Sequence, residues 1–394
     1  MSEERAPAPP RGTRPRNRRA LIVGAATELF LRNGYERVSM SDVANAVNVR
    51  PSALYRHFSG KARLLTAAVV EEMSVIRAVL DDPPGDLDVI GELLAAVAVD
   101  RRQLGTLWQR EARGLPAEEY ERLRAEVLGA VKALAKLVGS NRPDLAPYEA
   151  KLLASCTYSA LCGLSHHVDD LPRDQCVEVF RDILHTILRA EPVRSERGSA
   201  APESPGLSPV GRRERLLSSA IELFAEHGYT SVGMDDIGRQ SGIAAPSVYH
   251  HFESKQQLLS AALARGDEWL RHDMYWALKA STTPEEGLFR VITSYIDFAA
   301  RHPRHIDILI TEARHLDTIE RARTKQTQRD YINEWVHLML ATQPARSETE
   351  ARVRVHAMLA VANDVARTVE YRSSPNALET VKRFTVAIAL PGDR

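Results

Sequence analysis

Residues 38–65 read VSMSDVANAVNVRPSALYRHFSGKARLL, and residues 232–259 read VGMDDIGRQSGIAAPSVYHHFESKQQLL. The two stretches lie 194 residues apart and belong to a longer repeat. Residues 18–68 align without a gap to residues 212–262, with 19 of 51 positions identical. Chance would give about three identities at average residue usage. A repeat of this length indicates one structural unit that is present twice in the chain.

The repeated block predicts three helices. The first covers Arg18–Asn33 and ends at Gly34, a residue suited to a left-handed C-cap. A short second helix is followed by a three-residue turn whose centre must be left-handed, a conformation that Asn48 tolerates and Gly242 adopts freely. A third short helix is expected over residues 51–57 and 245–251. Helix, tight turn and short helix form the arrangement that places one helix in the major groove of DNA.

The run from Met40 to Leu65, with Tyr55-x-His57-Phe58-x-x-Lys61 at its centre, resembles the TetR/AcrR family of bacterial transcriptional regulators. The second copy repeats the signature as Tyr249-x-His251-Phe252-x-x-Lys255. The resemblance implies that the third helix contacts bases and that the Tyr and Lys side chains contact phosphates. The DNA-binding residues it implies are Arg18, Arg19, Ser39, Met40, Arg50, Ser52, Ala53, Tyr55, Arg56, His57 and Lys61, and Arg212, Arg213, Met234, Ala244, Ala245, Ser247, Tyr249, His250, His251 and Lys255.

Composition predicts a soluble globular protein, with 44% hydrophobic and 26% charged residues and no apolar stretch long enough to span a membrane. Three cysteines without paired spacing favour a reducing compartment, so a cytoplasmic location is expected, and they argue against a zinc site. No sequence motif of a hydrolase, phosphate loop or dinucleotide site is present, so an enzyme is the remote alternative. No cofactor is expected. A metal at His166 and the acidic residues after it lacks further ligands and is not expected either.

The net charge of zero is an average over unlike parts. Residues 1–70 hold 12 Lys and Arg against five Asp and Glu, a net +7, whereas residues 211–265 hold six of each. Contacts with phosphate dominate affinity for DNA, so the first copy should bind DNA more strongly. The role of the second copy in DNA binding stays open. Arginines in the N-terminal arm enter a minor groove in one interpretation and belong to a solvated tail in the other.

The pattern outside the repeat is helical, with apolar residues at three- and four-residue spacing. The expected fold class is all-α, with two tandem units, each a three-helix helix-turn-helix domain followed by a helical bundle for ligand binding and dimerisation. We call the helix-turn-helix domains the first and second heads, and the bundles the first and second bodies. The predicted boundaries are a disordered basic arm at 1–16, the first head at 17–68, the first body at 69–190, a flexible linker at 191–210, the second head at 211–262 and the second body at 263–394.

The resemblance implies a regulator of double-stranded operator DNA, most simply a repressor released by a small apolar or acyl-like effector. The last two helices of each body would pair in a four-helix interface, either within one chain as a pseudo-dimer or between two chains. A second, shorter motif is also repeated, as Glu111-Ala112-Arg113 and Glu312-Ala313-Arg314. We interpret it as a structural Glu–Arg pair. The candidate effector-binding residues are Trp108, Arg113, Tyr158, Cys162, His166, Trp276, Tyr295, Phe298, Arg314, Trp335, His337 and His356.

Overall fold

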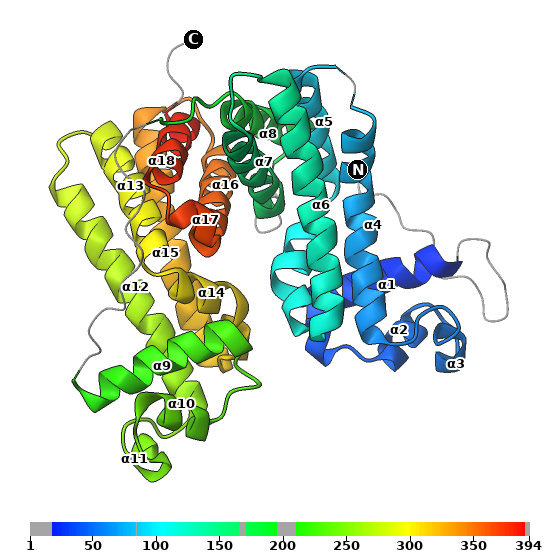
Figure 1. Ribbon diagram of the computed structural model, residues 1–394, viewed down its shortest axis with the longest axis vertical. Coiled ribbons are helices and arrows are strands. Elements are labelled where there is room, and N and C mark those ends of the chain that lie inside the picture. The colour runs from blue at the N-terminus through cyan, green and yellow to red at the C-terminus, as the bar shows by residue number, and fades with distance from the viewer. Residues whose placement is uncertain (1–17, 84, 165–170, 195–209, 391–394) are drawn as a thin grey trace.

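The computed structural model describes residues 18–83, 85–164, 171–194 and 210–390, and these residues form helices and no strand. The all-α prediction is therefore confirmed. Figure 1 shows the two halves of the chain side by side, with both heads at the same end of the molecule. The predicted basic arm and His166 lie outside the described residues.

The first half contains eight α-helices among its described residues: α1 (Arg18–Asn33), α2 (Met40–Ala46), α3 (Pro51–Leu54), α4 (Lys61–Asp81), α5 (Leu87–Asp100), α6 (Ala117–Asn141), α7 (Pro147–Gly163) and α8 (Arg173–Leu188). Short turns are η1 (Tyr35–Arg37), the π-helical η2 (Thr106–Glu111) and η3 (Ala112–Gly114).

The second half follows the same plan with α9 (Arg212–His227), α10 (Met234–Ser241), α11 (Ala245–Tyr249), α12 (Lys255–Lys279), α13 (Pro284–Arg301), α14 (Pro303–Thr311), η5 (Ala313–His315), α15 (Thr318–Thr342), α16 (Glu348–Arg367), α17 (Val369–Arg372) and α18 (Pro375–Ala389).

The turn between the second and third helices of each head has the predicted conformation. Asn48 has a φ of 54° and Gly242 a φ of 65°. Two details differ from the sequence-based expectation. Gly34 has a φ of 82° but a ψ of 147°, which is a glycine-only extended region and not a left-handed helical cap. The third helix is also shorter than predicted in both heads, because α3 ends at Leu54 and α11 at Tyr249.

Two hydrophobic cores hold the described residues together. One is continuous from the first head through the first body into the second body. The other belongs to the second head and includes three buried residues of the body behind it, Leu263, Ile308 and Leu316. The first head is thus packed into the main core, whereas the second head has a core largely of its own.

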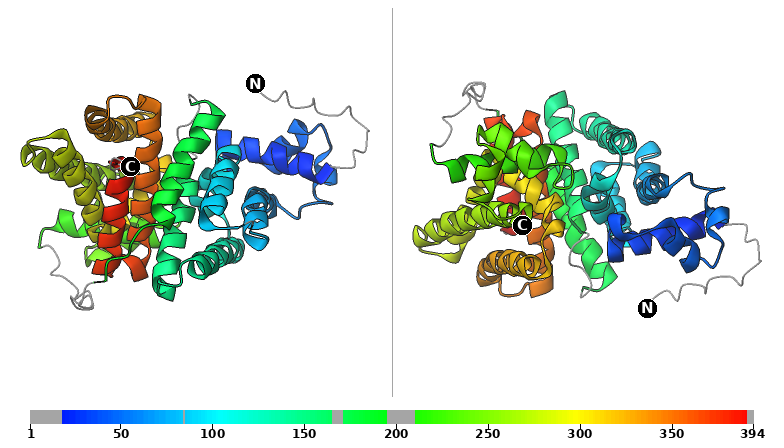
Figure 2. Two further views of the ribbon diagram at one scale, coloured as in Figure 1. Left: turned by 90° about the horizontal axis from the view of Figure 1, so that it is seen from above. Right: turned by 90° about the horizontal axis from the view of Figure 1, so that it is seen from below.

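The two halves meet mainly through α7 and α16, with α8 and α18 beside them, as both views in Figure 2 show. The helices approach closely at Gly163, where an added Cβ atom would lie 2.6 Å from the Cβ of Ala360. Polar contacts flank this point. The hydroxyl of Ser159 donates to Asp364 at 2.7 Å, and Arg354, whose side chain is 5% exposed, pairs with Asp182 at 3.1 Å.

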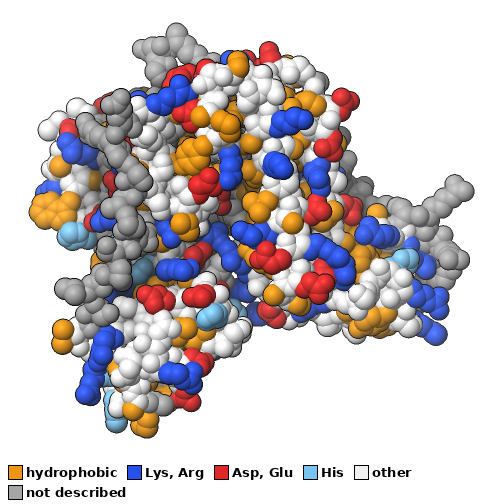
Figure 3. All heavy atoms as spheres, in the orientation of Figure 1, with side chains coloured by type: hydrophobic (Ala, Val, Ile, Leu, Met, Phe, Trp, Pro, Cys, Tyr) orange, Lys and Arg blue, Asp and Glu red, His pale blue; other side chains and the backbone are white. Residues whose placement is uncertain are grey.

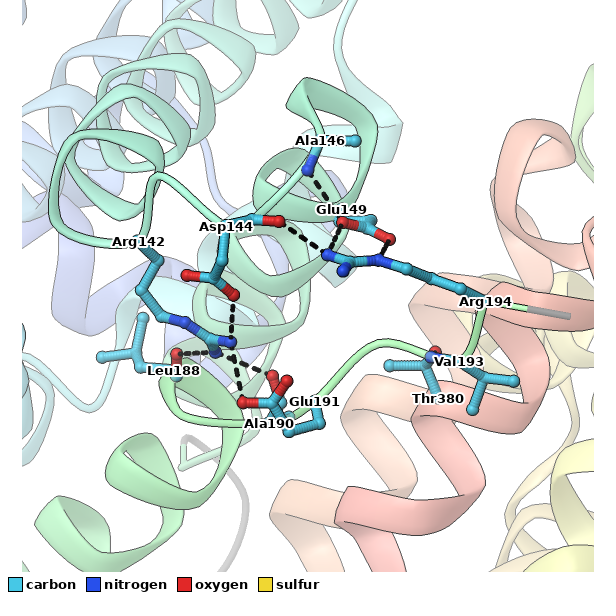
Figure 4. Close-up of polar contacts among 10 residues, drawn as sticks. All are labelled: Arg142, Asp144, Ala146, Glu149, Leu188, Ala190, Glu191, Val193, Arg194 and Thr380. Atoms are coloured by element: carbon cyan, nitrogen blue, oxygen red, sulfur yellow. Dashed lines mark hydrogen bonds and ion pairs between the residues drawn. The ribbon is translucent and has the colours of Figure 1, made fainter.

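Residues 191–194 form the ordered start of the segment predicted as a flexible linker (Figure 4). Arg142 donates to the carbonyl of the last residue of α8, to that of Ala190 and to acidic side chains. Arg194 binds the carboxylate of Glu149, at the start of α7, with two nitrogens. The backbone N–H of Val193 donates to Thr380 of α18 at 2.9 Å. These hydrogen bonds hold residues 191–194 against both halves of the molecule. The prediction of a flexible segment is therefore wrong for these four residues.

Replacement of Gly163 by alanine tests the packing of α7 on α16. We expect Gly163→Ala to destabilise the protein by about 1–3 kcal/mol, because the new methyl group must displace packed atoms of Ala360. The matched control is Gly129→Ala, since nothing lies within 4 Å of a Cβ atom at this position of α6. That control should stabilise by up to about 1 kcal/mol. Thermal unfolding measures both, and an unchanged or raised Tm for Gly163→Ala contradicts the close approach.

Candidate DNA-binding heads and effector cavity

The third helix of the first head presents a polar surface to solvent. Tyr55 is 56% exposed although it belongs to a head with a tight apolar core, so core packing does not explain its position. Arg56 beside it has a planar guanidinium group that can pair bidentately with guanine. Of the predicted residues here, Arg50, Ser52, Tyr55, Arg56 and His57 are exposed, and Ala53 is half-buried.

The second head presents a similar surface with fewer cations. Tyr249 is 52% exposed, and Ala244 and His250 are exposed beside it. Ser247 and His251 are half-buried, and the side chain of Ala245 lies outside the described residues. Alanine and histidine thus stand where the first head has Arg50 and Arg56, which lowers the positive charge of the surface.

Each head begins with two arginines, and the second of them lies against the ring of the phenylalanine that follows the third helix. The guanidinium carbon of Arg19 is 5.2 Å from the centre of the Phe58 ring, and that of Arg213 is 4.7 Å from the centre of the Phe252 ring. These cation–π contacts hold the start of the first helix beside the end of the third. The neighbouring arginines, Arg18 and Arg212, are half-buried and exposed, respectively.

Three of the predicted DNA contacts have structural roles instead. Met40 and Met234 are 8% and 9% exposed in the cores of their heads, which leaves their side chains no surface for DNA. Ser39 caps α2, because its hydroxyl accepts from the N–H of Asp42 while the Asp42 carboxylate accepts from the N–H and hydroxyl of Ser39. These bonds lower the pKa of Asp42 below its ordinary value.

The lysine of the signature motif donates hydrogen bonds to the backbone of its own head. The ammonium group of Lys61 donates to the carbonyls of Tyr35 at 2.8 Å and Glu36 at 3.3 Å, and it lies 4.2 Å from the centre of the Tyr35 ring. The second copy repeats this arrangement with Lys255 and the ring and carbonyl of Tyr229. An ammonium group has three N–H donors, so at most one remains for a phosphate.

A glutamate from each body fixes the head in front of it. The Glu111 carboxylate, which is almost fully buried, accepts from the backbone N–H of Tyr35 at 2.7 Å. Glu312 accepts from Tyr229 in the same way at 3.0 Å. The motif was expected to form a structural Glu–Arg pair, and Glu111 does pair with an arginine, its neighbour Arg110, at 2.6 Å. The repeated Glu-Ala-Arg motif is the sequence signal that marks this glutamate. The motif does not reveal the partner of Glu111, because Tyr35 lies 76 residues away in the sequence.

A cavity of about 300 Å³ lies inside the second body, and its exposed lining is mostly apolar. Helices α12 to α16 form most of its wall, and the first half closes it with Gly163 of α7 and with Gln109 and Arg110 of η2. This volume is at the lower end of small-molecule sites. Burial raises the pKa of Asp267, which lines the cavity, to about 6.

Two of the predicted effector residues line this cavity, Tyr295 and His356. Trp335 and Phe298 are buried in the core, with Trp335 packed edge-on against Tyr295. The other candidates that the structure describes do not line it. Trp108 stacks on Tyr120, Tyr158 and Cys162 are buried in α7, Arg113, Trp276 and His337 are exposed, and Arg314 lines a neighbouring cleft.

Among the described residues no group of three or more His, Cys, Asp or Glu side chains is arranged to hold a metal ion. In the same part of the chain, no helix combines the length and the apolar character needed to cross a membrane.

These heads and bodies define a class of helix-turn-helix regulators, and comparisons with known proteins identify the family. The family model of the bacterial regulatory proteins of the tetR family matches residues 22–68 and 216–262. The HTH-type transcriptional repressor KstR2 of Mycolicibacterium smegmatis is 30% identical over 142 residues, which are 35% of this chain and 68% of that protein. The HTH-type transcriptional activator FasR of the same organism is 36% identical over 87 residues, which are 22% of this chain and 40% of FasR.

Among solved structures, the ketosteroid transcriptional regulator KstR2 of Mycobacterium tuberculosis aligns with 46% of this chain and 94% of its own, at 20% identity and a TM-score of 0.41. The chain belongs to the tetR family and carries the DNA-binding domain of that family twice. Its relatives are regulators of transcription and not enzymes.

Lys61→Met tests the structural role of the signature lysine. The substitution leaves two carbonyl groups without their donor, so we expect the free energy of unfolding to fall by about 1–3 kcal/mol. Arg50→Met is the matched control, because Arg50 is exposed, and it should stay within about 0.5 kcal/mol of the original protein. Urea denaturation measures both. Equal stability of the two variants would show that Lys61 does not hold the head together.

Proposed function

We propose that this chain is a repressor that acts as its own dimer. Both heads would bind one pseudopalindromic operator, and a small apolar or acyl-like effector in the cavity of the second body would release them. The single observation that carries the proposal is the packing of α7 on α16, through Gly163 and Ala360, with both heads at the same end of the molecule.

The geometry of operator recognition supports a two-headed chain. Dimeric helix-turn-helix proteins bind half-sites about one helical turn of DNA, roughly 34–36 Å, apart. A covalent connection between the heads raises the effective concentration of the second head once the first has bound. The contacts of residues 191–194 with α7 and α18 favour pairing within one chain over pairing between chains.

The repressor assignment is supported by the likeness to KstR2, which is described as a repressor, although FasR is described as an activator. Release by an effector is supported by the cavity and its link to the first head. Arg110 lines the cavity, and the next residue, Glu111, holds the backbone of Tyr35. A ligand that displaces η2 would disturb this bond.

A second candidate function has the first head alone on DNA, with the second unit serving dimerisation and sensing. The charge difference favours it, because residues 211–265 have no net charge while residues 1–70 carry +7. The two candidates make different predictions for substitutions in the second head.

Arg56→Ala and His250→Ala, each in the full chain, test which heads contact the operator in the DNA upstream of the gene. We expect Arg56→Ala to weaken binding by about tenfold or more, the worth of one bidentate base contact. His250→Ala should weaken it by a smaller but measurable factor. The control is Lys132→Ala, an exposed position of α6 far along the chain from either head.

Gel retardation at one moderate salt concentration measures all three variants. Unchanged binding by His250→Ala would favour the one-headed candidate. Unchanged binding by both head variants would contradict DNA recognition by these helices.

A further inference from the structure

A cleft of about 710 Å³ lies between the first head and the second body. The first half contributes residues 31–37, at the end of α1, and two residues of η2, and the second half contributes residues of α14, η5 and α15. Seven Arg and Lys side chains line the cleft against two Glu. Figure 3 shows Lys and Arg side chains along the hollow between the two halves. The volume is in the range of small-molecule sites.

Most of this positive charge has no acidic partner in the protein. Within the ranges that the structure describes, no ion pair forms at Arg32, Arg37, Lys325 or Arg329. The carboxylate of Glu111 is already occupied by Arg110 and by the backbone N–H of Tyr35. Cations that share one space without counter-charges repel one another and attract anions. The cleft is therefore suited to a ligand with several negative charges.

A further donor in the wall lacks an acceptor. Arg321 lines the cleft and donates through Nη2 to the carbonyl of Leu316 at 3.1 Å. Its Nε is buried and has no hydrogen-bond partner among the described residues. A buried N–H group without an acceptor is unfavourable, so such groups in folded proteins normally have a partner. An anion beside this side chain would supply the missing acceptor.

The two walls of the cleft are connected through the backbone of η2. The Nη1 of Arg314, in η5, donates to the carbonyl of Arg110 at 3.4 Å. The next residue, Glu111, accepts from the N–H of Tyr35 at 2.7 Å. These bonds link the second body to the first head, so the cations of both walls face the same space before any ligand arrives. Such preorganisation lowers the cost of binding.

The cations on the first head belong to this cleft and not to the repeat. Arg32 and Arg37 align with Glu226 and Ser231 in the second copy. A pseudopalindromic duplex presents the same backbone to both heads, so cations that bind this backbone are expected in both copies. The difference between the copies favours a small ligand in the cleft over a DNA duplex.

We propose that this cleft binds a small polyphosphate anion, either inorganic or the phosphate chain of a nucleotide. Guanidinium groups on the first head and cations on α15 would donate to its oxygens, because guanidinium matches phosphate in charge and geometry. A ligand held by both walls joins the first head to the second body and opposes movement of that head. The inference goes beyond the proposed function, because it assigns a second site that requires neither an apolar effector nor an operator.

Calorimetric titration of the full chain at about 150 mM salt, where weak surface binding of anions is screened, tests the site. The probes are sodium triphosphate, ATP and orthophosphate, without magnesium. We expect triphosphate to bind at one site per chain and at least about tenfold more tightly than orthophosphate, because the longer anion can reach cations on both walls. ATP that binds more tightly than triphosphate identifies a nucleotide as the ligand, and otherwise the anion is inorganic. No binding of triphosphate or ATP, or equal binding of triphosphate and orthophosphate, overturns the proposal.

Two double variants test the walls separately. Lys325→Glu/Arg329→Glu changes two exposed residues one helical turn apart on α15, and Arg32→Gln/Arg37→Gln changes two exposed residues of the first head. The matched control is Lys132→Glu/Lys136→Glu, which has the same spacing and the same change of net charge on the exposed face of α6. We expect each wall variant to lose about tenfold or more in affinity for triphosphate, and the control to change by less than about twofold.

A loss in the control equal to that in the wall variants contradicts the proposal, and so does unchanged affinity in both wall variants. Weaker binding of a non-operator duplex with unchanged binding of triphosphate would also contradict it, because the cleft would then serve DNA. Thermal unfolding checks that each variant is folded. The titrations contain no DNA and no apolar probe, so their failure is distinguishable from a failure of the proposed repressor function.

Discussion

The close packing of α7 on α16 is the contact on which the arrangement of the chain depends. Gly163 permits it, because a larger residue would meet the Cβ of Ala360 at 2.6 Å. The Ser159–Asp364 and Arg354–Asp182 contacts then satisfy polar groups beside the apolar seam. Because α7 and α16 belong to different copies of the repeat, this seam brings both heads to one end of the molecule and closes the cavity of the second body with residues of the first half. The pairing of the two halves, the placement of both heads and the wall of the cavity thus depend on one packing surface.

The two copies are not equivalent, although they descend from one pattern. The first head shares its apolar core with both bodies, whereas the core of the second head is nearly separate. A body glutamate holds each head, Glu111 in the first copy and Glu312 in the second. A cleft lined by seven Arg and Lys side chains and two Glu, however, lies against the first head. This asymmetry has no counterpart in a regulator made of two identical chains.

Much of the fold could be predicted from the sequence, because its signals are local. The repeat, the positive φ at Asn48 and Gly242, and the all-helical class are set by residue types at fixed spacing. The contacts that the sequence did not predict join distant residues. Lys61 donates to carbonyls 25 and 26 residues away, and Glu111 accepts from a backbone N–H 76 residues away. Of the eleven proposed effector residues that the structure describes, only Tyr295 and His356 line the cavity, since its wall is assembled from six helices and a π-turn of both copies. The periodicity of apolar residues predicts which residues are buried, but it does not predict which of them line a cavity.

In the proposed function one chain supplies both halves of the dimer. The direct measurement is the mass of the complex with a duplex that carries a single operator, by native mass spectrometry or sedimentation. We expect one 43.8-kDa chain per duplex, and a free protein that sediments as a monomer. Two chains on a single operator, or a free protein that is a stable dimer at nanomolar concentration, would contradict the account.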